Sequence, residues 1–254
     1  MQVSFIQSPL VWENPQANRN YFTSTIASVP VDTNLIVLPE MFTSGFTMNP
    51  KAVAESMQGE TIQWLQLLAQ SRNCAITGSL VIEDGDQYYN RLVFVYPSGA
   101  IQSYDKKHLF TLSGEHEVYT AGTEKVVVEY MGWRICPFIC YDLRFPVFSR
   151  NNVNYDLLLY VASWPKTRTN AWDILLQARA VENMCYAIGV NRIGTDANGY
   201  EYIGHSQAID YLGKALVAAN EVEGVFTTIL DKDALLETRQ KLNFLNDQDA
   251  FYLL

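Results

Sequence analysis

Three apolar segments of the sequence each end in a side chain that could do chemistry. Residues 35–40 (LIVLPE) end in Glu40, residues 100–106 (AIQSYDK) in Lys106, and residues 137–140 (PFIC) in Cys140. In layered α/β proteins, functional groups gather outside the ends of the strands. If these three ends meet, a carboxylate, an ammonium group and a thiol form one site.

These three residue types together suit amide hydrolysis by acyl transfer. A thiol attacks a carbonyl carbon only as a thiolate, or with a base that takes its proton. Glu40 is the candidate base, since burial of a carboxylate favours its protonated form and suits it to proton transfer near neutral pH. Lys106 and the backbone N–H of Tyr141, the residue after Cys140, could stabilise the oxyanion of a tetrahedral intermediate. Such a reaction requires no metal and no cofactor.

Each of the three residues, taken alone, is more typical of ordinary structure. A cysteine at the end of an apolar strand is more often part of the core. A glutamate after Leu-Pro usually lies in a turn, and a lysine beside another lysine (Lys107) usually lies on the surface. Only the joint pattern of Glu40, Lys106 and Cys140 favours catalysis.

The elements that would position these residues alternate between short apolar strands and longer helical stretches. Runs such as LIVLP and LLLYVA are apolar on both faces, which indicates strands covered on both sides. This pattern favours an α/β fold with four layers, an αββα sandwich, and leaves a barrel open. Strands are predicted at 3–7, 34–40, 74–84, 91–97, 100–106, 125–130, 133–140, 156–164, 186–194, 203–211, 214–220 and 225–230, and helices after Asn14–Pro15 and at 60–72, 169–184 and 232–241.

Composition excludes several classes of function. The 254 residues carry a formal net charge of -9, which repels phosphate backbones and argues against nucleic-acid binding. No apolar run is long enough to span a bilayer and no signal peptide is recognisable, so we expect no membrane association and a cytoplasmic location. The four cysteines form no Cys-x-x-Cys pair and there are only three histidines, so we expect no metal site. The absence of repeats and linkers predicts a single domain over 1–254.

The three segments also resemble the signature regions of a known family. LPEMFTSGF (38–46), YDKKHLF (104–110) and CYDLRFP (140–146), in this order, are similar to the three motifs of the carbon–nitrogen hydrolase (nitrilase) superfamily. The resemblance implies an αββα sandwich of the nitrilase type formed by one carbon–nitrogen hydrolase domain. It implies Glu40 as general base, Lys106 as the catalytic lysine and Cys140 as nucleophile, with a thioester intermediate.

Further expectations follow from the resemblance. A second glutamate often assists in this family, and residues 113–122 (SGEHEVYTAG) offer Glu115 and Glu117, of which the spacing to the following Ala-Gly favours Glu115. The family habit implies a homodimer. Residues 162–213 look most like the omega-amidases, which hydrolyse the terminal amide of 2-oxoglutaramate or 2-oxosuccinamate.

That small-molecule substrate has a carboxylate far from its amide, so the pocket should offer a cation. Arg168 is the candidate for that cation, and a surface role at a helix start is an equal alternative. Trp164 and Phe42 could form apolar walls of the pocket. We expect Asp142 and Arg144 to fix the turn after Cys140, and Arg179 and Glu182 to form a buried pair behind the site.

Other functions remain open at this point. The same triad would serve another amidase, a carbamoylase or a nitrilase of the superfamily, and a partner-binding protein with a residual triad is a further alternative. A Ser-His-Asp hydrolase is disfavoured because no Gly-x-Ser-x-Gly elbow occurs. A dinucleotide-binding fold is disfavoured because Gly-x-Gly-x-x-Gly is absent.

Overall fold

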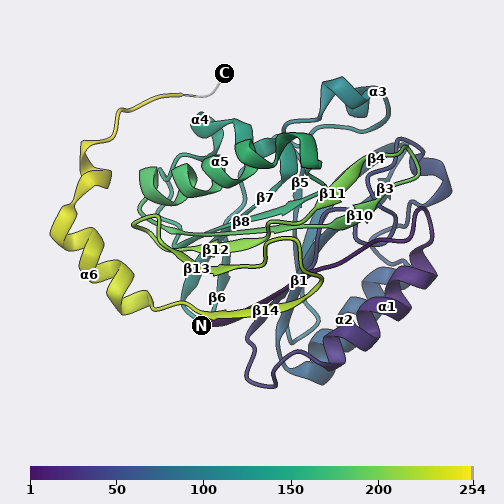
Figure 1. Cartoon of the computed structure of the whole chain (residues 1–254), viewed down its shortest axis with the longest axis horizontal. Helices are drawn as coiled ribbons and strands as arrows, with labels where there is room; N and C mark the ends of the chain where they lie inside the picture. The colour runs from purple at the N-terminus through teal and green to yellow at the C-terminus, as the bar shows by residue number, and fades with distance from the viewer. Residues whose placement is uncertain (253–254) are drawn as a thin grey trace.

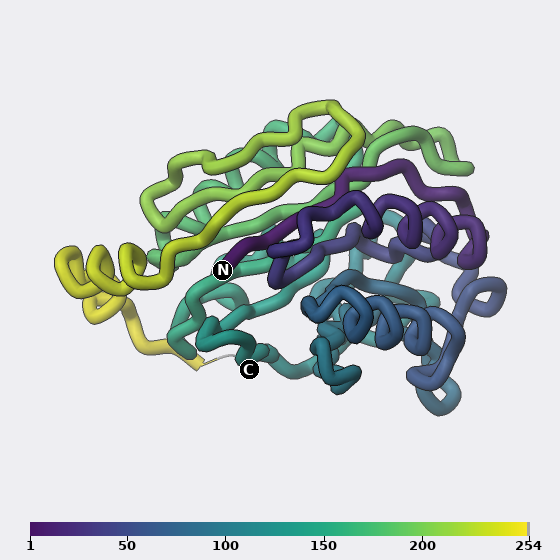
Figure 2. The backbone as a smooth tube through the Cα atoms, turned by 90° about the horizontal axis from the view of Figure 1, so that it is seen from below, coloured from purple at the N-terminus to yellow at the C-terminus, as the bar shows by residue number. Residues whose placement is uncertain are grey.

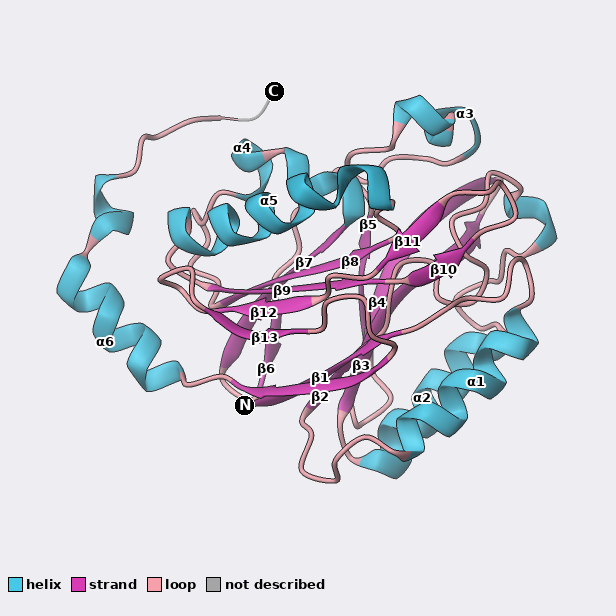
Figure 3. Cartoon of the chain, in the orientation of Figure 1, coloured by secondary structure: helices cyan, strands magenta, loops and turns pink. Residues whose placement is uncertain are grey.

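The computed structural model describes residues 1–252, and they form a sandwich of two β-sheets with helices on both outer faces (Figure 1). The first sheet has the strand order β14-β1-β2-β3-β4-β5 and the second β13-β12-β9-β8-β7-β6; β10 and β11 form a separate pair. Helices α1 and α2 cover the first sheet, and α5 covers the second (Figure 3). The predicted four-layer αββα architecture is therefore confirmed.

Each predicted strand segment corresponds to at least one strand of the structure. The first sheet consists of β1 (Gln2–Gln7), β2 (Leu35–Val37), β3 (Ala75–Asp84), β4 (Gln87–Val95), β5 (Ile101–Asp105) and β14 (Gly224–Ile229). The second consists of β6 (Val128–Tyr130), β7 (Trp133–Ile139), β8 (Leu157–Ala162), β9 (Tyr186–Asn191), β12 (Gln207–Ile209) and β13 (Ala215–Ala218). The separate pair is β10 (Ile193–Thr195) and β11 (Glu201–Ile203).

The helices begin and end where capping residues allow. The α-helices are α1 (Pro15–Ala27), α2 (Glu60–Arg72), α3 (Glu115–Val118), α4 (Pro146–Ser149), α5 (Thr169–Glu182) and α6 (Lys232–Leu242). The Asn14 side chain accepts a hydrogen bond from the N–H of Ala17, and Pro15 is the first helical residue, as the sequence predicts. Helix α2 ends at Asn73, which adopts the left-handed conformation common at helix C-termini. None of the helices within residues 1–252 is long and apolar enough to cross a membrane.

Strand alternation explains why both faces of the first sheet are apolar. In β2, Leu35 and Val37 belong to the core between the two sheets, whereas Ile36 packs with the core under α1 and α2. Neighbouring side chains of a strand point to opposite faces, so a sheet covered on both sides needs continuous apolar runs.

The strand directions bring the ends of distant segments together. β1, β2 and β3 are parallel, and β5 runs in the same direction as β3 because two antiparallel pairings separate them. In the second sheet β7, β8 and β9 are parallel. The C-terminal ends of β2 and β5 therefore lie at the same edge of the first sheet.

The first and last strands, β1 and β14, lie side by side, which Figure 2 shows as purple next to yellow.

Several predicted strands are shorter than expected, among them 34–40 and 125–130, and two others are interrupted. The strand expected at 186–194 ends at Asn191, because its side chain bonds the backbone of Trp164 and of Gly204 and the chain leaves the second sheet there. The strand expected at 203–211 is likewise divided between β11 and β12. The resulting β10–β11 hairpin projects from the sandwich and contributes to the candidate active site described below.

The buried core should carry most of the stability. Phe138 in β7 is fully buried, and its ring contacts the rings of Tyr104, Phe148 and Tyr160. We expect Phe138→Ala to lower the free energy of unfolding by about 3–5 kcal/mol in urea titrations, because the change leaves a cavity in this core. The control Phe244→Ala removes an exposed ring and should change stability by at most about 0.5 kcal/mol. Equal effects of the two changes would contradict this view of the core.

Candidate active site

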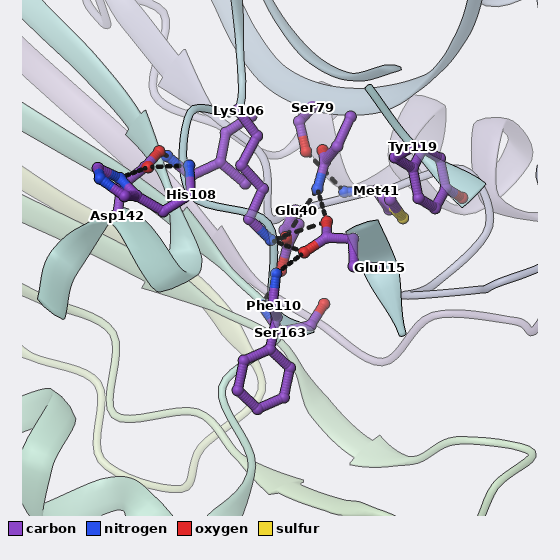
Figure 4. A network of polar contacts seen from close by, with 12 residues as sticks. Glu40, Met41, Ser79, Lys106, His108, Phe110, Glu115, Tyr119, Asp142 and Ser163 are labelled. Atoms are coloured by element: carbon purple, nitrogen blue, oxygen red, sulfur yellow. Dashed lines mark hydrogen bonds and ion pairs between the residues drawn. The ribbon is translucent and has the colours of Figure 1, made fainter. Parts of the chain in front are cut away.

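Glu40 and Lys106 meet in the interior of the protein. Glu40 lies three residues beyond β2, and Lys106 directly follows β5. The Lys106 Nζ donates to Glu40 Oε1 at 2.9 Å, and neither side chain is exposed (Figure 4). The other carboxylate oxygen of Glu40 accepts a hydrogen bond from the backbone N–H of Ser163 at 2.7 Å. The pair thus joins the first sheet to the end of β8 in the second.

Glu115, rather than Glu117, joins this pair. Lys106 Nζ lies 2.9 Å from both carboxylate oxygens of Glu115, and the N–H of Phe110 donates to its Oε2 at 2.5 Å. Glu115 is fully buried at the first position of α3, whereas Glu117 is exposed. The geometry therefore favours Glu115 of the two candidates from the sequence.

Burial shapes the protonation of this cluster. Burial opposes the charge of the Lys106 ammonium, but Glu115 and then Glu40 outweigh that effect, so the pKa of Lys106 is raised above its ordinary value. Burial also raises the pKa of Glu115, although Lys106 opposes the shift, and the nearby Glu40 raises the pKa further. One ammonium group is therefore held between two carboxyl groups that compete for it.

Cys140 begins a 3₁₀ turn, η3 (Cys140–Arg144), directly after β7. Its φ of 44° lies in the left-handed region, which a residue with a Cβ rarely adopts. Burial, and then the charge of Glu40, raise the pKa of the Cys140 thiol well above its ordinary value, whereas Lys106 and the N–H of Ser163 lower it. A shift in this direction favours the neutral thiol, so attack on a carbonyl carbon requires a base.

Asp142 holds the turn after Cys140 through four hydrogen bonds. Its Oδ2 accepts from the N–H of Ile139 at 3.0 Å and from the hydroxyl of Tyr104 at 2.8 Å. Its Oδ1 accepts from the N–H of His108 at 3.0 Å and lies 2.7 Å from His108 Nδ1. Tyr104 and His108 flank Lys106 in the sequence, so Asp142 fixes Cys140 relative to Lys106. The structural role expected for Asp142 is confirmed.

The expected pair Arg179–Glu182 forms on α5. Arg179 Nη1 lies 2.9 Å from Glu182 Oε1, and Arg179 Nη2 donates to the carbonyl of Leu143 in the turn at 2.7 Å. Arg179 is buried, whereas the Glu182 side chain is about one-third exposed. The pair therefore lies partly at the surface, and its buried half supports the turn after Cys140.

Tyr141 occupies the second position of the 3₁₀ turn. The first N–H groups of a helix have no acceptor within that helix, so the N–H of Tyr141 is left for another acceptor. The ring of Tyr141 packs edge-on against Phe110 and Phe145. This arrangement is compatible with an N–H directed at an oxyanion beside Cys140.

A cavity of about 610 Å³ opens onto Lys106 and Cys140. Tyr141, Ser163, Trp164 and Arg168 also line it, as do residues from the N-terminal segment and the β10–β11 hairpin: Trp12, Glu13, Asp196, Asn198, Tyr200 and Tyr202. Trp164, expected as an apolar wall, and Arg168, expected as a cation of the pocket, thus both line the cavity.

Phe42 does not line the cavity, and its expected role as a pocket wall is wrong. The residue is fully buried, and its ring packs against Phe22 and Trp64 in the core under α1 and α2. The preceding residue, Met41, has a φ of 43°, a turn that the apolar pattern does not reveal. Phe46 is a cavity wall instead, and its ring centroid lies 5.0 Å from Lys106 Nζ.

Two arginine side chains reach the cavity. The guanidinium of Arg168 lies 5.2 Å from the ring centroid of Phe110, and that of Arg144 lies 4.9 Å from the ring of Trp164. Within residues 1–252 neither guanidinium takes part in an ion pair. We expected Arg144 to fix the turn after Cys140, but among the described residues its guanidinium makes no hydrogen bond to that turn and its side chain lines the cavity instead.

Sequence reasoning missed another polar residue at the site. Asn90 of β4 is fully buried and donates from Nδ2 to Glu40 and to Glu115. Its only signal in the sequence is an amide that precedes the apolar run 92–95.

Among the described residues no group of three or more His, Cys, Asp or Glu side chains is placed to hold a metal ion. That the reaction needs no cofactor stays a prediction.

Comparisons with known proteins identify the family. The family model of carbon-nitrogen hydrolases matches residues 2–240. The omega-amidase YafV of Yersinia enterocolitica is 44% identical, over 100% of this chain and 99% of that protein, and the 2-oxoglutaramate amidase of Bacillus subtilis is 30% identical over 96% of each. The crystal structure of XC1258, a CN-hydrolase superfamily protein from Xanthomonas campestris with an arsenic adduct in its active site, superposes with a TM-score of 0.97 at 42% identity, over 100% of this chain and 98% of that one. The chain belongs to the carbon-nitrogen hydrolase family.

Proposed function

We propose that this carbon–nitrogen hydrolase is an omega-amidase, which hydrolyses the terminal amide of short 2-oxo dicarboxylic acid monoamides such as 2-oxoglutaramate and 2-oxosuccinamate. The observation that carries the proposal is the similarity to omega-amidases over the full length of the chain, at 42–44% identity. Two unpaired guanidinium groups in the cavity beside Cys140 support it. The products are the 2-oxo acid and ammonia.

The acylation half of the proposed reaction uses Cys140, Glu40 and Lys106. Cys140 Sγ attacks the amide carbonyl carbon while its proton passes to Glu40. The Lys106 ammonium and the N–H of Tyr141 stabilise the negative oxygen of the tetrahedral intermediate. The C–N bond then breaks, the proton on Glu40 passes to the leaving nitrogen, and ammonia departs from a thioester on Cys140.

The deacylation half regenerates the thiol. Water attacks the thioester carbonyl and gives a proton to Glu40, and the C–S bond breaks as the proton returns to the Cys140 sulfur. Glu115 assists by holding the Lys106 side chain in place beside Glu40, since both carboxylate oxygens of Glu115 lie 2.9 Å from Lys106 Nζ. The reaction balances with water as the only co-reactant.

The distal carboxylate of the substrate gives the guanidinium groups a function. A 2-oxo dicarboxylic acid monoamide places one carboxylate at the opposite end from its amide. With the amide carbon at Cys140, Arg144 and Arg168 are the cations in the cavity wall that lack an ion-pair partner among the described residues. A guanidinium binds a carboxylate through two parallel hydrogen bonds, which fixes orientation as well as affinity.

The proposed function predicts a particular order of substrates. In an ammonia-release assay over amides, nitriles and N-carbamoyl amino acids, we expect 2-oxo dicarboxylic acid monoamides to give the highest kcat/KM. Cys140→Ala should lower kcat by at least about 10³-fold without unfolding the protein, because the nucleophile is lost. The control Cys74→Ala changes a buried cysteine under α1 and α2 and should keep its activity. Much faster turnover of nitriles or carbamoyl compounds would assign the chain to another branch of the family.

The cations in the cavity can be tested separately. We expect Arg144→Ala and Arg168→Ala to lower kcat/KM for 2-oxoglutaramate by about 10- to 100-fold each, which corresponds to losing a charge-assisted hydrogen bond. Turnover of an uncharged amide of similar length should change little. Lys166→Ala serves as the control, since that exposed lysine pairs with Glu201 and does not line the cavity. An equal loss for charged and uncharged amides would show that these arginines do not bind the carboxylate.

We also propose that the enzyme is a cytoplasmic homodimer in which residues 1–254 form a single domain; of these, residues 253 and 254 lie outside the described chain. The outer face of α5 supports the dimer, because Ile174 is 56% exposed and Val181 45% exposed. Leu212, in a turn that packs beside Val181, extends this apolar surface. Soluble monomers rarely leave such apolar side chains together on one face.

Sedimentation velocity tests the dimer. We expect a species of about twice the chain mass of 28.8 kDa. The double change Ile174→Glu and Val181→Glu should shift the protein toward monomer, because it places charges in an apolar interface. Leu67→Glu, on the exposed face of α2 in the opposite helical layer, should leave the dimer intact. A monomeric wild-type protein at assay concentration would refute the proposal.

A further inference from the structure

Asn90 lies at the point where three parts of the candidate active site meet. It belongs to β4, and its side chain is fully buried. Its backbone carbonyl accepts a hydrogen bond from the N–H of Lys106 at 3.0 Å. The next residue, Arg91, forms a two-pronged ion pair with Asp105, the residue before Lys106. β4 therefore fixes the backbone from which Lys106 projects.

The side chain of Asn90 contacts both carboxylates of the site. Its Nδ2 lies 2.9 Å from Glu40 Oε1 and 3.3 Å from Glu115 Oε1. Among the described residues, Lys106 is the other side chain that donates to both glutamates. Figure 4 shows Glu40 and Glu115 converging on Lys106 from separate parts of the chain.

The numbers of N–H groups on Lys106 and on Asn90 indicate different roles for the two side chains. The Lys106 ammonium has three N–H groups and makes three contacts, all of them with carboxylate oxygens of Glu40 and Glu115. To donate to an oxyanion, Lys106 must give up one of these contacts. Asn90 has two N–H groups on Nδ2, one for each carboxylate, and it makes no contact that the reaction would require it to release.

We propose that Asn90 is a positioning residue of the amidase: its amide keeps Glu40 and Glu115 in place while Lys106 turns an N–H toward the developing oxyanion. This inference rests on the proposed function, and it names a residue that positions the two glutamates of the same site. Asn90 does not line the cavity, and its amide donates to the two glutamates, so it acts through them and not on the substrate.

The orientation of the amide is fixed by its neighbours. Asn90 Oδ1 is buried and has no hydrogen-bond partner in the described structure. The side-chain amide is therefore held in its orientation by the hydrogen bonds of Nδ2 alone. A flipped amide would turn Oδ1 toward two carboxylate oxygens and lose both hydrogen bonds. The charged or titratable groups that face the two carboxylates are Lys106 after β5, Cys140 at the turn after β7, Tyr119 after α3 and Tyr202 of β11.

The pH dependence of catalysis reports on this role. Hydrogen bonds from Asn90 favour the ionised carboxylates, so without them the two carboxyl groups take up protons at a higher pH. A general base must be ionised, and the acid limb of the kcat/KM profile should therefore move to higher pH. We expect Asn90→Ala to move that limb up by about one pH unit and to lower kcat about 10- to 100-fold with little change in KM.

Two further variants separate positioning from simple stability. Asn90→Ser keeps one donor, so its acid limb should lie between those of the wild type and Asn90→Ala, and it replaces the latter if the alanine variant does not fold. Asn151→Ala removes a buried amide that donates to the carbonyls of Tyr155 and Asn183, away from the cavity. That control should lower the melting temperature without moving the acid limb.

An activity-independent measurement distinguishes failure of this inference from failure of the proposed function. Infrared difference spectra against pH detect the protonated carboxyl stretch of buried glutamates, with Glu115→Gln used to assign the band. That band should appear at a higher pH in Asn90→Ala than in the wild type, whatever the substrate is. An unchanged band and an unchanged acid limb would overturn the role of Asn90. A shifted band in a protein that does not hydrolyse 2-oxo acid amides would instead overturn only the proposed substrate.

Discussion

The site depends on one buried ammonium group shared between two buried carboxyl groups. Moving each ion out of water costs several kcal/mol, and Lys106 alone cannot compensate both Glu40 and Glu115. The additional donors are the backbone N–H groups of Phe110 and Ser163 and the amide of Asn90. These groups come from both sheets and from the segment after β5, so the cluster can form only when the sandwich is assembled.

The second constraint is the backbone of Cys140. A left-handed conformation costs a residue with a Cβ about 1–2 kcal/mol, and here it occurs at Cys140, directly after β7, where the residue lines the cavity. The four hydrogen bonds of Asp142 offset that strain, and two of its partners flank Lys106. The strained turn and the ion cluster are therefore not independent, because Asp142 bonds both the turn at Cys140 and the residues on either side of Lys106.

The parts of the site that follow from strand periodicity could be predicted from the sequence. Glu40 and Lys106 follow β2 and β5, which run in the same direction in the first sheet, so their meeting at one edge was predictable. Cys140 follows β7 in the second sheet and was expected beside them only from the joint pattern of the three residues. The contact of Asn90 with Glu40 spans 50 residues and depends on the pairing of β2 with β3, two strands that are separated in the chain by α2, and no local pattern encodes that pairing. Phe42 and Arg144 were misjudged for a related reason: the chain turns at Met41 and at Cys140, which both have positive φ although neither is a glycine, and these turns redirect both side chains.

The charge arrangement also bears on how the proposed product would leave. Hydrolysis converts a neutral amide beside Cys140 into a carboxylate, next to Glu40 and Glu115, whose shared ammonium is already engaged by both. Like charges at close range in a low-dielectric interior repel strongly. In the proposed reaction the amide end of the substrate would therefore be tolerated where the acid end of the product would not, while Arg144 and Arg168 would bind the distal carboxylate equally in both. The ion cluster that activates Cys140 would thus also favour release of the acid.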